Sequence, residues 1–138
     1  MKIKMLLRNQ KLQMCVCLIL VMFMVSSISF ALGNQDEELQ KKYAAILGEY
    51  EFDLSEFGGE PIVVEFRVDS GSLWADSGDG QPTTLEPIGD EPYEFTADDP
   101  ESGALEIKFV KDDEGKYTIC TIALLDQGAE ISGNKIKQ

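Results

Sequence analysis

Residues 62–76 read IVVEFRVDSGSLWAD, two strand-like runs joined by Asp-Ser-Gly. In the first run, every second residue from Ile62 to Val68 is apolar, and the charged Glu65 and Arg67 fall between them. A period of two is typical of a strand that buries one face. Asp-Ser-Gly supplies the side-chain hydrogen bonds and the positive φ that tight turns need. The stretch therefore predicts a β-hairpin.

The same pattern recurs after Gly48. Turn residues separate the runs at intervals of about 8–12 residues, which is typical of an antiparallel sandwich or barrel. We predict a mainly β domain over residues 48–138, an antiparallel up-and-down meander of about eight strands that forms a small barrel or half-barrel. The almost wholly apolar KYTICTIALL indicates a central strand or one covered on both faces. The other strand-like runs are EYEFDL, TTLEPIG, PYEFTA, ALEIKFV and GAEISGNKIKQ.

One short helix is predicted before the strands. Residues 36–47 read DEELQKKYAAIL, with acids in the first turn, where they favour the positive end of the helix dipole. Gly48 is a natural stop. We assign residues 32–47 to this N-terminal helix and expect its apolar face to dock onto another part of the molecule. The side chains that share this face are Leu39, Tyr43, Ile46 and Leu47.

The first 31 residues have the composition of a signal peptide. Four bases and no acid come first, and an uncharged, largely apolar run follows from Leu12 to Leu32. Ser29-x-Ala31 suits signal peptidase, so we expect cleavage after Ala31. The alternative is an uncleaved membrane anchor over residues 12–32, because about 20 apolar residues can cross a bilayer. In both cases we expect the rest of the chain to be exported, periplasmic or extracellular.

The part beyond the signal is strongly acidic. Residues 32–138 contain 8 basic and 25 acidic residues, a formal charge of −17. Such a surface repels phosphate backbones and anionic headgroups, which argues against nucleic acid and anionic membrane surfaces as partners. Cys120 is the one cysteine beyond the signal, so no internal disulfide can form. Its apolar surroundings indicate a buried thiol.

The acidic loops have the character of turns. From Asp76, DSGDGQPTTLEP has acids at its first and fourth positions and Pro87 at its twelfth. An EF-hand loop needs alternate ligands and a bidentate Glu at that twelfth position. KDDEGKYT and TADDPESG are shorter and lack a later ligand. We therefore interpret these loops as hairpin turns and expect neither a metal nor a cofactor.

The order of the features is similar to that of a known family. It resembles the lipocalin-like C-terminal domain of unknown function appended to secreted penicillin-binding or β-lactamase-type serine hydrolases, over residues 39–137. The resemblance implies an eight-stranded barrel or half-barrel behind a helix, an accessory role, and no catalytic residues to carry over. The series that carries it is Gly48-Glu-Tyr50, Val64-x-Phe66-x-Val68, Ser70-Gly71-Ser-Leu73-Trp74, Gly80-Gln-Pro82, Leu85-x-Pro87, Phe95, Ile107-x-Phe109, Asp113-x-Gly115-Lys116 and Gly128…Lys135-Ile136.

The sequence offers little for catalysis. It contains no histidine, which removes Ser-His-Asp and Cys-His nucleophile systems. Its one Ser-x-x-Lys, from Ser132 to Lys135, lies in a strand-like run, where an offset of three points the two side chains to opposite faces. The many acids give chance carboxylate pairs, which carry no weight for a glycosidase. We expect no catalytic residues and no enzyme activity.

Binding is the class of function that remains. A small barrel can hold one small ligand or be filled by its own side chains, and filling is the default for a domain of this size. We take Trp74, Tyr93 and Phe109 as candidate ligand contacts; the alternative for Trp74 is a plug in the barrel mouth. We expect a non-catalytic barrel that binds a small hydrophobic ligand or an envelope protein. The alternative is a structural accessory domain that docks on a separate envelope serine hydrolase.

Overall fold

One helix precedes eight strands in the part of the chain that the structure describes. The computed structural model describes residues 33–137, and the predicted signal peptide, residues 1–31, lies outside this range. The helix occupies residues 33–43 and is followed by a turn at residues 44–46. The strands are β1 (Gly48–Phe52), β2 (Ile62–Asp69), β3 (Ser72–Asp76), β4 (Thr83–Pro87), β5 (Glu94–Asp99), β6 (Gly103–Lys111), β7 (Tyr117–Leu124) and β8 (Ala129–Lys137), with a short 3₁₀ turn, η1 (Ser55–Phe57), between β1 and β2.

The strands form a closed antiparallel barrel. Each strand pairs with the next along the chain, and β8 returns to pair with β1, where Phe52 lies opposite Gly133. The prediction of a mainly β, up-and-down meander of about eight strands behind one short helix is confirmed. Of the two predicted forms, a barrel and a half-barrel, the structure has the closed barrel. Closure leaves no unpaired strand edge.

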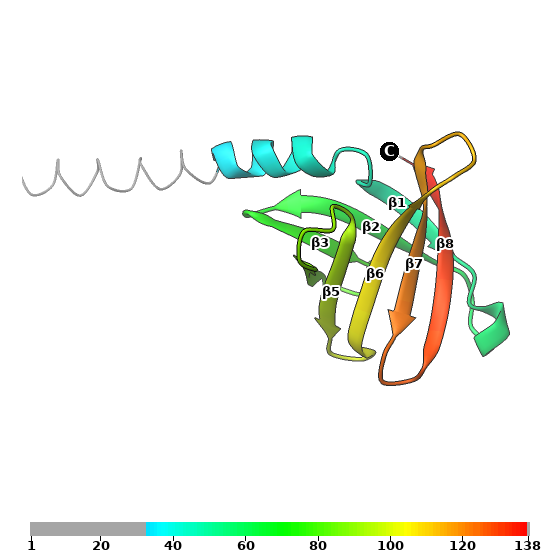
Figure 1. Cartoon of the computed structure of the whole chain (residues 1–138). Coiled ribbons are helices and arrows are strands. Elements are labelled where there is room, and N and C mark those ends of the chain that lie inside the picture. Colours follow the sequence, from blue (N-terminus) through cyan, green and yellow to red (C-terminus); the bar gives the residue numbers. More distant parts are fainter. Residues whose placement is uncertain (1–32, 138) are drawn as a thin grey trace, which may run out of the picture. The chain divides into compact units, whose positions relative to one another are not determined.

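The barrel has two unlike ends (Figure 1). The β2–β3, β4–β5 and β6–β7 turns lie at the same end as the helix, which we call the helix end. The β1–β2, β3–β4, β5–β6 and β7–β8 connections lie at the opposite end, which we call the loop end. In Figure 1 the helix runs across the upper end, and the β5–β6 and β7–β8 turns are lowest.

The hairpin predicted over residues 62–76 is confirmed. Val68 pairs with Leu73 and Phe66 with Ala75, around a two-residue turn of Ser70 and Gly71. These two residues have φ values of 50° and 76°, and positive φ at both central positions is what a type I′ hairpin turn requires. Because directly opposite residues of an antiparallel pair share a face, this turn decides which side chains of β3 point into the barrel.

Aromatic rings fill the helix end. Phe109 lies at their centre, with ring centroids 4.9 Å from Phe66, 5.5 Å from Tyr50 and 6.0 Å from Phe95. All of these pairs are edge-to-face, the arrangement that aromatic quadrupoles favour. Tyr43 from the helix adds an edge contact to Phe95 at 5.5 Å. The apolar face of the helix therefore packs onto the barrel core, in line with the predicted docking.

Two polar contacts hold the helix over this end. The hydroxyl of Tyr50 donates a hydrogen bond to the backbone oxygen of Ile46 at 3.0 Å, so this buried hydroxyl has a partner. The backbone N–H of Gly71, in the β2–β3 turn, donates to the carboxylate of Asp36 at 2.6 Å. The helix and the turn that follows it are therefore fixed to the barrel at two points.

The bounds of the helix and of the first strand differ from the prediction. The helix ends at residue 43 and not at 47, because the Tyr43 oxygen accepts from the N–H groups of both Ile46 and Leu47 in a tight turn that leads into β1. The first strand ends at Phe52, since Leu54 begins the 3₁₀ turn. In β7 only Cys120 is fully buried, so this strand is not covered on both faces. It is the other predicted case, a central strand, because it pairs with both β6 and β8.

Candidate ligand-binding cavity

At the loop end the barrel encloses a cavity of about 380 Å³ that opens to solvent. Its floor is formed by Phe66, Leu85 and Ile107, which are nearly inaccessible to solvent. Its walls are aliphatic and come mainly from Val64, Ala97, Leu105, Ile122 and Ile131. Sites for small molecules commonly have about 300–1,000 Å³ and a mostly apolar lining. The expectation that side chains fill the barrel therefore holds for the helix end alone.

The cavity lies where the inward-facing side chains of β3 and β5 become smaller toward the loop end. Along β3, the buried Leu73 is followed on the same face by Ala75. Along β5, Phe95 is followed by Ala97. The barrel circumference is set by eight strands along its whole length, so small side chains leave space that larger ones would occupy.

The mouth of the cavity is polar on one side. All of the polar lining residues come from two neighbouring segments, residues 77–83 and residues 99–102. The remaining rim, at Ile62, Leu124 and Ile131, is apolar. A ligand that enters would therefore meet hydrogen-bonding groups on one side and aliphatic groups on the other.

Asp99 is the most firmly held group of the polar side. Its carboxylate accepts hydrogen bonds from the N–H of Ser102 at 2.7 Å, the N–H of Glu101 at 3.0 Å and the hydroxyl of Thr83 at 3.1 Å. Burial alone would raise the pKa of Asp99, but these hydrogen bonds outweigh it and keep the pKa below its usual value. Asp99 is therefore an ionised, fixed carboxylate that ties the start of β4 to the β5–β6 turn.

The acidic loops fold as turns that their own carboxylates cap, as predicted. In the β3–β4 loop, Asp76 accepts from the N–H of Gly78 at 2.8 Å, and Asp79 accepts from the N–H of Gln81 at 2.7 Å. In the β6–β7 turn, Asp112 accepts from the N–H groups of Glu114 and Lys116. These are Asx-type turns, in which a side chain replaces a backbone acceptor. Across residues 33–137, no group of three or more Asp, Glu or Cys side chains is arranged to hold a metal ion.

Trp74, the first of the three predicted contacts, lies on the outer face of the barrel. It pairs with Arg67, whereas its neighbours Leu73 and Ala75 point inward. Its indole N–H donates to the backbone oxygen of Asp69 at 3.0 Å. Arg67 in turn bridges Asp76 at 2.6 Å, so this face of the hairpin is polar. Trp74 therefore neither lines the cavity nor plugs its mouth.

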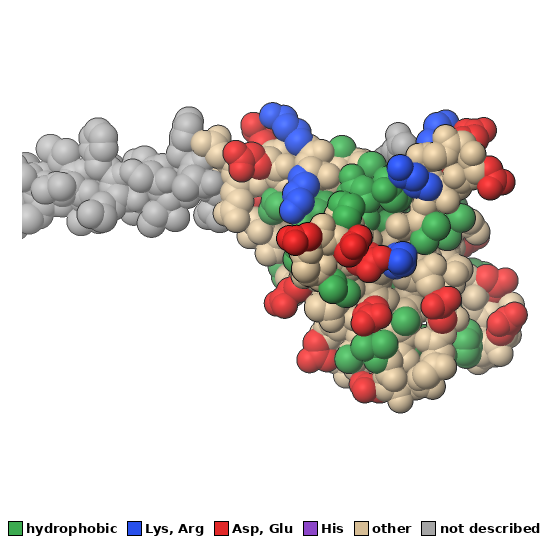
Figure 2. All heavy atoms as spheres, viewed as in Figure 1, with side chains coloured by type: hydrophobic (Ala, Val, Ile, Leu, Met, Phe, Trp, Pro, Cys, Tyr) green, Lys and Arg blue, Asp and Glu red, His purple; other side chains and the backbone are tan. Residues whose placement is uncertain are grey.

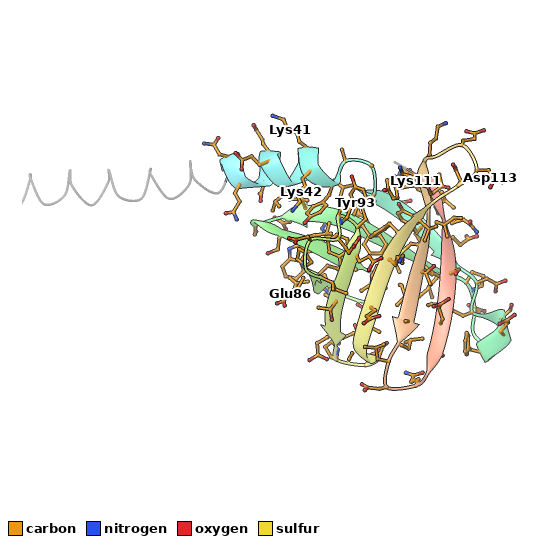
Figure 3. All side chains as sticks on the ribbon, viewed as in Figure 1. Lys41, Lys42, Glu86, Tyr93, Lys111 and Asp113 are labelled. Atoms are coloured by element: carbon orange, nitrogen blue, oxygen red, sulfur yellow. The ribbon has the colours of Figure 1, made fainter. Side chains whose placement is uncertain are left out.

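Tyr93 and Phe109, the other two predicted contacts, belong to the helix end. Phe109 is inside the barrel but in its packed half, and its N–H donates to the backbone oxygen of Tyr93 at 3.0 Å. Tyr93 is half-buried and stacks edge-on against Tyr117 at 4.4 Å between ring centroids. Figure 3 shows Tyr93 beside the helix, away from the loop end. The structure brings these two residues together and places neither in the cavity wall.

The Ser-x-x-Lys segment is a strand with its two side chains on opposite faces, as predicted. Ser132 lies on the outer face, 3.4 Å from the hydroxyl of Thr121. Lys135 lies over the Tyr50 ring, donates to the backbone oxygen of Ala45 at 3.1 Å, and has a pKa lowered by burial. Cys120 is fully buried, as predicted, and burial raises the pKa of its thiol.

The residues that form the cavity are absent from the set predicted to contact a ligand. Ala75, Ala97 and Asp99 belong to no sequence motif, and they form part of one site only because the strand pairing brings them together.

Comparison of the chain with protein-family models, with curated proteins and with solved structures gave no match. Within residues 33–137, no helix has both the length and the apolar character needed to cross a bilayer.

Proposed function

We propose that this protein is a non-catalytic barrel protein that binds one small hydrophobic molecule in the cavity at the loop end. The observation that carries the proposal is a cavity of about 380 Å³ that opens to solvent at the loop end and has an apolar floor of Phe66, Leu85 and Ile107. An apolar ligand there would remove its own surface and that of the walls from water, at about 25 cal/mol per Å². The helix closes the opposite end, so the cavity is a cup with one entrance.

The polar groups of the mouth favour binding over catalysis. A general base works best with a pKa near the working pH, and the pKa of Asp99 is shifted the other way. Its three hydrogen-bond donors also leave it little freedom to move toward a substrate. These groups are suited to orient a ligand at the entrance.

We propose that binding takes place outside the cytoplasm, in the periplasm or the extracellular medium. This rests on the signal-like residues 1–31, with an uncleaved anchor over residues 12–32 as the alternative. The high negative charge of the remaining chain would keep it soluble there. Docking on a separate envelope serine hydrolase stays a prediction that rests on the family resemblance alone.

Calorimetric titration of the purified protein with octanol tests the proposal, since octanol is neutral and small enough for the cavity. We expect saturable binding of one molecule per barrel, with the negative heat-capacity change of apolar burial. Replacing the cavity-lining Ala75 by Phe should fill the cup and abolish binding. Ala123→Phe is the matched control, because Ala123 pairs with Glu106 on β6 and Glu130 on β8 and is not part of the cavity wall. No saturable binding by the unmodified chain, or unchanged binding by Ala75→Phe, would overturn the proposal.

A further inference from the structure

We propose that the cavity selects ligands that carry a positive charge, namely amphiphilic amines whose alkyl part lies in the cup and whose ammonium group lies at the carboxylates of Asp79, Asp99 and Glu101. The inference rests on the proposed function and adds the charge class of the ligand. It concerns the mouth of the cavity, whereas the proposed function depends on the apolar floor.

The charge of the mouth has one sign. Asp79, Asp99 and Glu101 are part of the lining, and none of the described residues that line the cavity is a lysine or an arginine. Two bases on strands that line the cavity form ion pairs away from it: Arg67 with Asp76 on the outer face of the barrel, and Lys108 with Glu94. In Figure 2, the lower part of the visible face, toward the loop end, carries acidic side chains and no basic ones.

The position of these carboxylates matches an amphiphile. They lie on the side of the mouth formed by residues 77–83 and 99–102, directly above aliphatic walls. Asp99 is held in place by three donors and is ionised, so one of the charges is already oriented before a ligand arrives. Attraction between charges is stronger at a partly dry entrance than in bulk water. A cation would gain this attraction, a neutral headgroup would not, and an anion would be repelled.

The expected preference is moderate. Ion pairs with substantial exposure to solvent contribute little individually. The carboxylates of the mouth should together give about a tenfold tighter dissociation constant for an amine than for the carboxylate of the same chain length. The neutral alcohol should fall between the two.

Calorimetric titrations with octylamine, octanol and octanoate at neutral pH test the inference. We expect affinity to fall in that order, and the difference to shrink at about 1 M salt, where the Debye length is about 3 Å. The double variant Asp79→Asn, Glu101→Gln should lose most of the preference for octylamine over octanoate. The matched control is Asp113→Asn, Glu114→Gln in the β6–β7 turn, which removes the same charge at the helix end and should keep the preference.

The outcomes separate this inference from the proposed function. If octanol binds but octylamine binds no more tightly than octanoate, the charge inference is overturned and the binding function stands. If the control variant loses as much preference as the mouth variant, the overall charge of the protein is responsible, and the inference is overturned as well. If none of the three molecules binds, the proposed function fails and the inference fails with it.

Discussion

The two ends of this barrel are built from the same eight strands and differ in what their inward faces carry. At the helix end, the rings of Tyr50, Phe66 and Phe109 meet edge to face and leave no room for a ligand. At the loop end, Ala75 and Ala97 occupy equivalent inward positions and a cavity remains. The difference shows that closing a sheet fixes a volume, and side-chain size alone then decides whether that volume is core or binding site.

The contrast also separates stability from function along each strand. A residue of the packed half contacts other side chains on all sides, so its removal leaves a void that the surroundings cannot refill. A residue of the open half already faces space, so its removal changes the shape of the cup more than the stability of the fold. Substitutions in the packed half should therefore mainly change stability, and substitutions in the open half should mainly change ligand binding.

The largest expected effect comes from the centre of the packed half. Phe109→Ala should lower the free energy of unfolding by about 3–5 kcal/mol, because it removes a buried ring from three aromatic contacts. Leu105→Ala, on the same strand and also facing inward, should cost less than about 2 kcal/mol because Leu105 borders the cavity. Urea unfolding followed by circular dichroism measures both. Equal losses for the two variants would show that the halves do not differ in packing.

A smaller effect is expected where β8 passes the ring of Phe52. Gly133 lies opposite Phe52 in the β1–β8 ladder, and a Cβ atom added to it would lie 2.7 Å from two carbons of that ring. Gly133→Ala should therefore cost about 1–3 kcal/mol through overpacking. Thermal unfolding measures the loss, and Phe52→Leu in the same chain should recover part of it. If the double variant is no more stable than the sum of its single changes predicts, the steric explanation is wrong.

The smallest predicted effect is on the pH dependence of stability, at the turn above the packed half. The N–H of Lys116, the hydroxyl of Thr118 and the N–H of Glu114 stabilise the ionised carboxylate of Asp112 and lower its pKa. A lowered pKa in the folded state contributes stability above the unfolded value of about 3.9 and loses it as the pH falls through the folded value. Asp112→Asn should therefore show a shallower loss of melting temperature below about pH 4 than the unmodified chain.

The neighbouring acid provides the control for this pH prediction. Asp113→Asn removes the same charge from the same turn, and we expect it to follow the unmodified chain between about pH 5 and pH 3. If the two variants respond alike, the hydrogen bonds to Asp112 contribute nothing specific. The comparison is made between variants because acidification also changes the self-repulsion of this acidic protein.

Much of the fold was predictable from the sequence because periodicity and turn chemistry are local properties. The alternation in residues 62–68 and the turn residues Ser70 and Gly71 were sufficient to predict a hairpin. The length of the turn also fixes the register between the two strands. A two-residue loop sets Val68 opposite Leu73 and therefore Arg67 opposite Trp74, which predicts an outward Trp74 from parity alone. The same parity disfavours Trp74 as a contact for a ligand inside the barrel.

The cavity was harder to predict because it depends on contacts between strands that are distant in sequence. Ala75 and Ala97 are small residues at inward positions of β3 and β5, which is a signal that the sequence contains. Whether they leave a void depends on how the other strands fill the same layer of the barrel, and that requires the register of the whole closed sheet. Local patterns could not supply it.

The central claim is that the barrel is filled at the helix end and accepts a ligand at the loop end. Nitrogen–proton correlation spectra of the purified protein, recorded during a titration with octanol, test it directly. The account predicts saturable shifts of amide signals near the cavity, at Val64, Ala97 and Ile122, with little change at Tyr43 and Tyr50. Shifts centred on Tyr43 and Tyr50, or none at all, would contradict it.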